Sequence, residues 1–269
     1  MTHSAEPSAT TDPAVLTGAA YRDGSGLAAR RSLYDWQTPR HDLPGIVAEA
    51  LTGVRGAVAD VGCGSGAVLR RLAQARPDLT LIGVDLSAGI LSGVPVPVAV
   101  ADVEHLPFSD GRLGAALALH MLYHARDIPA AVAELRRVVA PGGLVVVSTN
   151  SGTDKRELDQ LWRRASGDVL GVPEGPSRVT LSSRFRLEDA QVLLADHFAS
   201  VRVLPLPGTI TVTDPEPVIA HLASYRAWAA QAGVPFDATI QRAREILDEH
   251  IRTNGCFTIT CLGGILICA

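Results

Sequence analysis

The sequence predicts a doubly wound α/β fold, in which helices cover both faces of a mostly parallel sheet. Between residues 57 and 148, short apolar runs alternate with segments of helical spacing. The first run, Ala57 to Ala59, leads through Asp60 into a tight turn and then directly into a helical pattern. The turn contains three glycines at alternate positions, Gly62, Gly64 and Gly66. Strand, glycine turn and helix in this order are typical of a parallel sheet that binds a ligand at the carboxyl end of its strands.

The remaining elements extend this pattern to the end of the chain. Strands are expected at 57–59, 79–84, 96–100, 113–119 and 144–148, with helices after the glycine turn and from 127 to 139. Beyond residue 150, helices are expected at 153–169, 187–198, 215–233 and 236–252, and strands at 201–206 and 255–268. Two late strands separated by helices indicate an antiparallel edge on the parallel sheet.

Length and composition narrow the class of protein. At 269 residues, with 47% hydrophobic and 19% charged residues, the chain is expected to form one globular domain. Its net charge of −4 gives no electrostatic argument for a nucleic-acid partner. No apolar run approaches the roughly 20 residues of a membrane span, and no secretory signal pattern opens the chain. Four cysteines without CxxC spacing favour a reduced, cytoplasmic protein.

The domain is expected to span residues 14–269, after a disordered tail at 1–13 that is rich in Ser, Thr, Ala and Pro. Within it, the segments 14–51, 151–183 and 214–254 are expected to form a helical cap. The first of these contains Tyr21, Tyr34 and Trp36, in a chain with only 4% aromatic residues. These side chains either pin the segment onto the domain or wall a ligand pocket, and the sequence leaves both interpretations open.

Two kinds of cofactor fit the glycine turn. Gly62, Gly64 and Ala67 satisfy a relaxed dinucleotide fingerprint, and Asp85 stands at a suitable distance for a ribose. Because this motif alone is weak, a dinucleotide-dependent oxidoreductase stays one hypothesis among others.

Acids at the ends of three strands favour a different ligand. Asp60 ends the first strand, where it would repel a pyrophosphate and attract an ammonium group. Asp85 ends the second strand and can accept hydrogen bonds from both ribose hydroxyls. Asp102 follows the third strand and can accept from an adenine amino group, while the Val103 amide donates to the ring. The three acids together predict a nucleoside ligand that carries positive charge.

Four motifs in order resemble those of class I S-adenosylmethionine-dependent methyltransferases. They are DVGCGSG at 60–66, VDLS at 84–87, ADVEHLPF at 101–108 and LRRVVAPGGLVVV at 135–147. The resemblance implies a Rossmann-like sheet of seven strands in the order 3-2-1-4-5-7-6, with the last strand antiparallel. It also implies S-adenosylmethionine as the cofactor, and a backbone carbonyl at His120 that meets the cofactor's amino group. The cofactor-binding residues implied are Asp60, Gly62, Cys63, Gly64, Gly66, Asp85, Leu86, Ser87, Asp102, Val103 and His120.

The stretch HMLYH, at 120–124, leaves the fourth strand where the side chains should face the reacting groups. It is similar to a stretch found in small-molecule members of the same superfamily. His124 or His120 is a candidate general base, or a group that orients the acceptor, and Tyr34 is a further catalytic candidate. The alternative is that both imidazoles satisfy backbone groups, since methyl transfer does not require a base. The expected substrate pocket contains Tyr21, Tyr34, Trp36, Tyr123 and Asn150.

These features predict methyl transfer to O, N or C of a small organic acceptor. We expect no metal site, because the acidic ligands of catechol-type enzymes are replaced here by His120. We also expect no nucleic-acid or membrane partner, and the sequence leaves a homodimer open. A composition rich in Ala, Arg and Gly indicates specialised metabolism, that is natural product biosynthesis, in a high-GC bacterium. The alternative function is a protein that binds the same cofactor and catalyses a non-methylating reaction such as a cyclisation.

Overall fold

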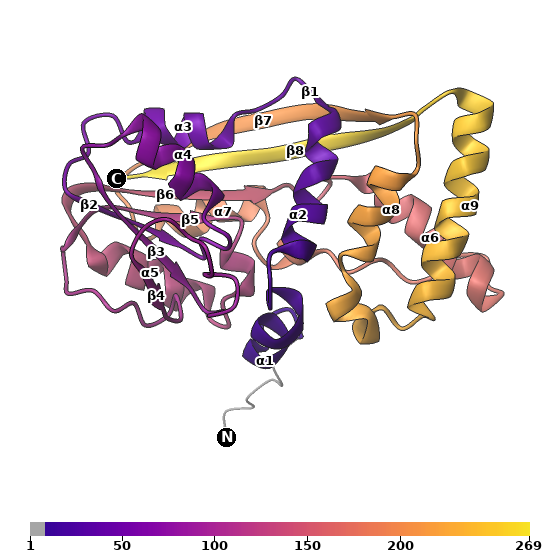
Figure 1. The fold of residues 1–269 in the computed structure, drawn as a ribbon, viewed down its shortest axis with the longest axis horizontal. Helices are drawn as coiled ribbons and strands as arrows, with labels where there is room; N and C mark the ends of the chain where they lie inside the picture. The colour runs from indigo at the N-terminus through magenta and orange to yellow at the C-terminus, as the bar shows by residue number, and fades with distance from the viewer. Residues whose placement is uncertain (1–8) are drawn as a thin grey trace.

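The centre of the protein is a mixed β-sheet with a helical cap at one end (Figure 1). The computed structural model describes residues 9–269. Over these residues the sheet has eight strands, in the order β1-β7-β8-β6-β5-β2-β3-β4. The expected count of seven is therefore wrong. The additional strand is β1 (Gln37–Thr38), which pairs antiparallel with β7 at the sheet edge. The other seven strands, numbered along the chain without β1, stand in the order 3-2-1-4-5-7-6.

Five strands form the parallel half of the sheet. β2 (Ala57–Val61) lies between β3 (Thr80–Asp85) and β5 (Leu113–Leu119), and it pairs parallel with both. β4 (Val98–Val100) continues the sheet beyond β3, and β6 (Val139–Asn150) continues it beyond β5. All five carboxyl ends therefore meet at one edge, which is where a doubly wound sheet binds its ligand.

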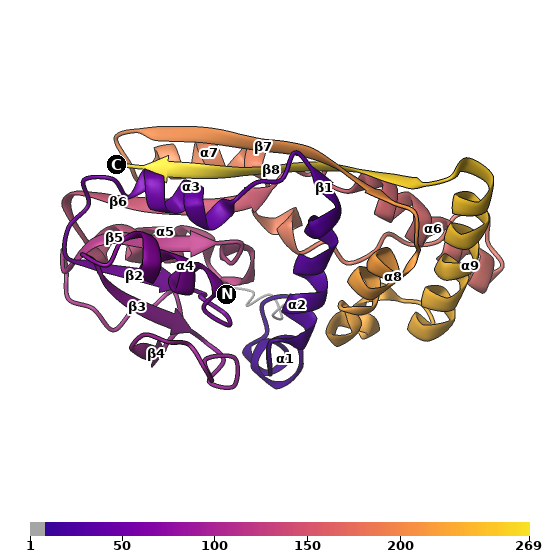
Figure 2. The same ribbon diagram turned by 45° about the horizontal axis from the view of Figure 1, so that its top comes forward.

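Two long antiparallel strands connect the sheet to the cap. β8 (Phe257–Cys268) pairs with β6 only from Gly263 to Cys268, but with β7 (Val201–Val212) along its whole length. The unshared half of the β7–β8 ladder therefore extends past the parallel strands and into the cap (Figures 1 and 2). The antiparallel edge that the sequence predicts is present. β7 continues six residues beyond the expected strand at 201–206, whereas β8 begins two residues later than the expected strand at 255–268.

Helices cover both faces of the sheet because the central strands are apolar at nearly every position, so that each face carries apolar side chains. On one face, α3 (Leu43–Ala50) and α4 (Ala67–Ala75) pack with the side chains of Val58, Leu117 and their neighbours. On the other face, α5 (Ile128–Val138) and α7 (Leu187–Ala195) pack with Ala59, Val147 and the residues that alternate with them. Each fully buried Leu or Val contributes about 1.5–3 kcal/mol to folding. The prediction that all of residues 14–51 belong to the cap is therefore wrong for α3, because the apolar face of this helix packs on the sheet.

The cap has a hydrophobic core of its own. The helices of the cap are α1 (Pro13–Val15), η1 (Leu16–Ala20), α2 (Ser25–Ser32), η2 (Leu33–Trp36), α6 (Arg156–Leu170), η4 (Leu181–Arg184), α8 (Glu216–Ala223), η5 (Arg226–Ala232) and α9 (Phe236–Asn254). Among them, Leu16 of η1, Leu181 of η4 and Trp228 of η5 are buried in the core that α5 and α7 share with the sheet. Leu33, Trp162 and Leu247 are buried in the cap's own core together with Ile210 of β7 and Ile259 of β8. Because these two strands supply side chains to both cores, the cap is an extension of the sheet and not a separate domain.

The structure describes only part of the tail that the sequence predicts to be disordered, residues 1–13. Its first eight residues lie outside the described part of the chain. The remaining five are ordered against the domain, which corrects the prediction for this stretch. Thr10 and Thr11 are buried, and the Ala9 carbonyl accepts a hydrogen bond from Trp228 Nε1 at 3.1 Å. Asp12 caps α1 by accepting from the Ala14 N–H.

Candidate active site

A cavity of about 970 Å³ lies between the carboxyl edge of the parallel strands and the cap. It brings together most of the residues that the sequence singles out. Those lining it are Tyr21, Tyr34, Asp60, Gly62, Cys63, Gly64, Asp85, Leu86, Ser87, Asp102, Val103, His120, Tyr123, His124 and Asn150. Two predicted residues do not line it. Trp36 ends η2 with its side chain 43% exposed, which corrects its assignment to the pocket, and Gly66 instead starts α4 in the left-handed conformation.

The glycine turn after β2 is held so tightly that its glycines have no room for a side chain. The backbone N–H groups of Gly62 and Cys63 both donate to the Val84 carbonyl, at 2.7 and 3.0 Å. A Cβ on Gly62 would lie 2.7 Å from the Cβ of Met121, at a φ of +70° that only glycine adopts easily. The turn therefore presents bare backbone to the cavity.

Two carboxylates at this end of the cavity are buried without a cation. Asp60 is 2% exposed, and no cation or hydrogen-bond donor among residues 9–269 lowers the pKa of its carboxyl group. Burial, and then the charge of Asp85, raises the pKa of Asp60 to about 7. Asp85 accepts from the Gly64 N–H and the Ser87 N–H, both at 2.9 Å, yet burial still raises its pKa. A ligand with positive charge would relieve both groups.

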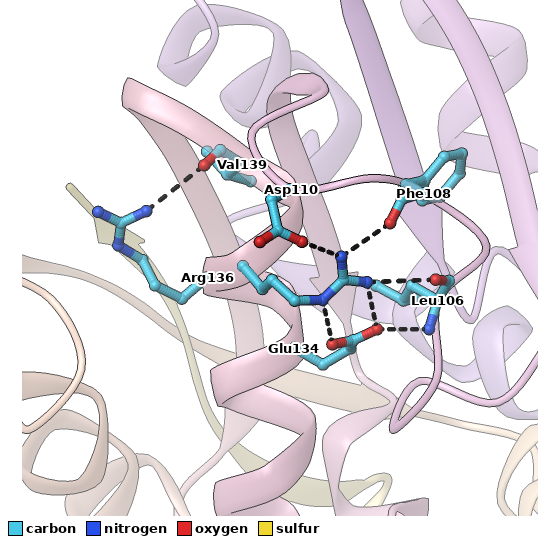
Figure 3. A network of polar contacts seen from close by, with 7 residues as sticks. Leu106, Phe108, Asp110, Glu134, Arg136 and Val139 are labelled. Atoms are coloured by element: carbon cyan, nitrogen blue, oxygen red, sulfur yellow. Dashed lines mark hydrogen bonds and ion pairs between the residues drawn. The ribbon is translucent and has the colours of Figure 1, made fainter.

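Asp102 and Val103 begin a loop that α5 holds in place. Asp102 follows β4 and accepts from the Glu104 N–H at 3.0 Å. Further along, the N–H of Leu106 donates to Glu134 at 2.8 Å (Figure 3). Arg137, one turn after Glu134, donates to it and also to the carbonyls of Leu106 and Phe108. This network fixes the loop between β4 and β5, so the position of Asp102 depends on charged groups of α5.

His124, in the short helix η3 (Leu122–His124), is hydrogen-bonded at both ring nitrogens. Nδ1 lies 2.8 Å from the Thr10 carbonyl, and because a carbonyl only accepts, Nδ1 carries the proton. Nε2 is therefore the acceptor for the Tyr21 hydroxyl, at 2.7 Å. Burial lowers the pKa of His124 to about 4 and raises that of Tyr21 to about 12. The pair is neutral, with His124 orienting Tyr21 and not available as a free base.

His120 directly follows β5 and has an unusual backbone conformation. Its φ of +53° is rare for a residue with a side chain, and its N–H donates to the Ser148 carbonyl at 3.0 Å. Burial, and then the charge of Lys155, lowers the pKa of its imidazole to about 4. Its neighbour Tyr123 is buried and packs edge-on to His124.

Tyr34 contacts a buried lysine that the sequence did not single out. Lys155 is 4% exposed, and its Nζ donates to the Tyr34 hydroxyl at 2.7 Å and pairs with Asp154 at 2.6 Å. Asp154 also accepts from the Leu262 N–H of β8, at 2.8 Å. Burial opposes the charge on Lys155, but Tyr34 and Asp154 hold its pKa above its usual value. Because the Tyr34 oxygen accepts from Lys155, its own proton is free to donate to a ligand.

Several polar residues of the cap also line the cavity without a prior prediction. They are Arg30, Lys155, Arg178, His221 and Tyr225. Lys155 lies five residues after Asn150, the last residue of β6, so its place near the carboxyl end of a parallel strand could have indicated a cavity residue. The others lie on cap segments far apart in the chain, and no spacing in the sequence connects them.

Two kinds of feature are absent from the described residues. Across residues 9–269, no three His, Cys, Asp or Glu side chains are grouped as a metal ion requires. The helices of the same residues include none with the length and apolar character needed to cross a bilayer.

Comparisons with known proteins agree with this geometry. Residues 59–147 match the family described as a methyltransferase domain. A ubiquinone biosynthesis O-methyltransferase of Alkalilimnicola ehrlichii is 35% identical over 195 residues, covering 56% of this chain and 78% of that protein. A malonyl-[acyl-carrier protein] O-methyltransferase of Serratia marcescens is 30% identical over 114 residues, or 40% of this chain. The chain spans about half the length of the relatives of this second kind, between 42% and 57%.

Solved structures show the same fold. A putative methyltransferase from an antibiotic biosynthesis pathway of Anabaena variabilis has a TM-score of 0.58 and 17% identity, over 83% of this chain and 96% of that chain. A phosphoethanolamine N-methyltransferase 2 of Haemonchus contortus has a TM-score of 0.52 and 15% identity, over 98% of this chain and 60% of that chain. The fold and the cavity define a doubly wound α/β protein with a ligand-sized cavity at the carboxyl ends of its parallel strands. The chain belongs to the class I S-adenosylmethionine-dependent methyltransferases.

Proposed function

We propose that this protein transfers the methyl group of S-adenosylmethionine to a small organic acceptor held beneath the cap. One observation carries the proposal: a single cavity joins the glycine turn and its buried carboxylates to the side chains of the cap. Its volume of about 970 Å³ is at the upper end of the usual range for ligand pockets, about 300–1,000 Å³. Such a volume leaves room for an acceptor beside a nucleoside cofactor.

The residues at the sheet end fit this cofactor. Asp60, which is buried with no cation beside it among residues 9–269, would pair with the cofactor's ammonium group, and Asp85 would pair with the ribose hydroxyls. Asp102 and Val103 would pair with adenine at the loop that α5 holds. When bound, the cofactor supplies a methyl group already activated by the positive sulfur. The Haemonchus protein of similar fold is known in complex with S-adenosylhomocysteine, which also favours this assignment.

Positioning is the main contribution that the chain's own residues make to the reaction. Tyr21 donates its proton to His124, so its oxygen is left to accept from a hydroxyl of the acceptor. Tyr34, held by Lys155, can donate to the acceptor from the cap side. With the cap excluding water, alignment of the two reacting groups supplies much of the acceleration.

The atom methylated is proposed to be oxygen. Two kinds of relative that the chain resembles, the ubiquinone and malonyl types, are both named O-methyltransferases. The tyrosine hydroxyls around the cavity are suited to orient a hydroxyl or carboxyl group. The proposed acceptor is a small specialised metabolite, the proposed location is the cytoplasm, and no nucleic acid or membrane takes part.

Calorimetry with S-adenosylmethionine and S-adenosylhomocysteine tests the cofactor, with NADH as the control ligand. Both sulfur ligands should bind and NADH should not. Asp85→Ala should weaken binding by about 2 kcal/mol, or roughly thirtyfold, because a ribose contact is lost. Binding of NADH alone would refute the proposal. A methyl-labelled cofactor offered with an acceptor library should then yield a product heavier by one labelled methyl group, whereas a cyclisation would leave the mass unchanged.

A further inference from the structure

The cap end of the cavity carries more positive than negative charge. Arg30, Lys155 and Arg178 line it, and His221 of α8 lies among them, 3% exposed. Burial, and then the positive charges of Lys155, Arg178 and Arg30, lower the pKa of His221. The Arg30 backbone raises this pKa, but by less. Among residues 9–269, only Lys155 of the three cations has a carboxylate partner, Asp154. The buried Arg30 and the half-buried Arg178 therefore have no carboxylate partner among the described residues.

Polar atoms in the same place lack hydrogen-bond partners. Within the described part of the chain, Arg30 Nη2, Arg178 Nε and both ring nitrogens of His221 are buried without one. Arg30 is 8% exposed, and its other terminal nitrogen, Nη1, donates to the Ser224 carbonyl at 3.2 Å. Buried polar groups in proteins are nearly always paired, so unpartnered atoms on three neighbouring residues indicate a missing ligand.

Arg30 points toward the cap and away from the glycine turn. On α2, it is Leu27 that approaches the turn, since a Cβ on Gly64 would lie 3.0 Å from Leu27 Cδ2. The Arg30 guanidinium lies 5.6 Å from the ring centre of Tyr225 and 5.2 Å from that of Tyr21. Figure 1 shows α2 between the parallel strands and α8. The Arg30 guanidinium thus lies against Ser224 and Tyr225 of the cap and not against the glycine turn.

We propose that Arg30, Arg178 and His221 form an oxyanion subsite, which binds a carboxylate or phosphate group of the acceptor. Guanidinium groups match the geometry of either anion with paired hydrogen bonds, and they do so most strongly where water is excluded. Lys155, already paired with Asp154, adds a fixed positive charge. The acceptor is therefore an organic acid or a phosphate ester. This inference rests on the proposed function in one respect: the molecule that binds at the subsite is taken to be the methyl acceptor.

The test is calorimetry of the full chain with benzoate, phenyl phosphate and neutral benzamide, with and without S-adenosylhomocysteine. At least one acid should bind about tenfold more tightly than benzamide. Arg30→Gln and Arg178→Gln should each remove most of this preference, whereas Arg178→Lys should keep part of it. Arg226→Gln is the matched control, because Arg226 lies on the cap but pairs with Asp237 outside the cavity. The tighter of the two acids identifies the anion as carboxylate or phosphate.

Each other outcome overturns the inference. The inference fails if the acids and the amide bind equally, or if neither acid binds. It also fails if the preference for the acid is unchanged in both Arg30→Gln and Arg178→Gln. Loss of S-adenosylhomocysteine affinity in these variants would assign the cations to the cofactor's own carboxylate instead. If wild-type protein binds no S-adenosylhomocysteine, the proposed function fails, but the acid preference measured without it still decides the subsite. Should Arg30→Gln fail to fold, the half-buried Arg178 provides the deciding variant.

Discussion

Asp60 should make cofactor binding depend on pH in a specific way. In the ligand-free protein its pKa is about 7, so it is close to half ionised at neutral pH. An ammonium group beside it favours the ionised form, so binding should require loss of the Asp60 proton. The ionised fraction rises from about one in eleven at pH 6 to one half at pH 7, and the affinity for S-adenosylhomocysteine should rise about fivefold over that interval. Binding at pH 7 should release about half a proton.

A matched ligand separates Asp60 from Asp85. 5′-Methylthioadenosine keeps the adenosine but has no ammonium group, so it contacts Asp85 and not Asp60. Its affinity should lack the fivefold rise, and Asp60→Asn should flatten the curve for S-adenosylhomocysteine as well. Calorimetry at pH 6 and 7, in buffers of different ionisation enthalpy, gives both the affinity and the proton count. Equal pH dependence for the two ligands would show that Asp60 does not meet the ammonium group.

Two further predictions concern the walls of the site. Gly62→Ala should lower the free energy of unfolding by roughly 2–3 kcal/mol, because its Cβ would lie 2.7 Å from Met121 at a positive φ. Gly53→Ala, also at a positive φ (+87°) but with open space around it, should cost only about 1 kcal/mol and leave cofactor affinity unchanged. Equal costs of the two substitutions in chemical denaturation would contradict the steric argument. Tyr21→Phe should lower the free energy of unfolding by about 1–3 kcal/mol, because the buried Nε2 of His124 loses its donor. An unchanged denaturation midpoint would mean that this hydrogen bond is not formed in solution.

The parallel half of the fold could be predicted because its signals are local. Each strand from β2 to β6 contains an apolar run, and the acids Asp60 and Asp85 lie at the carboxyl ends of two of them. Parallel strands bring such ends to one edge, so the carboxylate end of the cavity followed from the sequence. β1 could not be predicted, since two residues pairing with Thr209 and Ile210 carry no pattern of their own.

The cap end could not be predicted because its contacts are not local. Arg30, Arg178 and His221 come from three separate segments, and only the packing of those segments brings the side chains together. The prediction for Trp36 was wrong for a related reason: an indole suits a pocket wall, but at the end of η2 this side chain is exposed and lies outside the cavity. The helical pattern of α3 was read correctly as a helix, while the surface it covers depended on the finished sheet.

The shared strands β7 and β8 set a limit on how this protein can be redesigned. The cap is assembled from several stretches of chain, and its core includes the far halves of two strands whose near halves complete the sheet. The segments that form the cap therefore cannot be transferred as one unit to another methyltransferase. Moving the pocket would mean moving part of the central sheet, so changes of specificity are expected to come through substitutions at single positions lining the cavity.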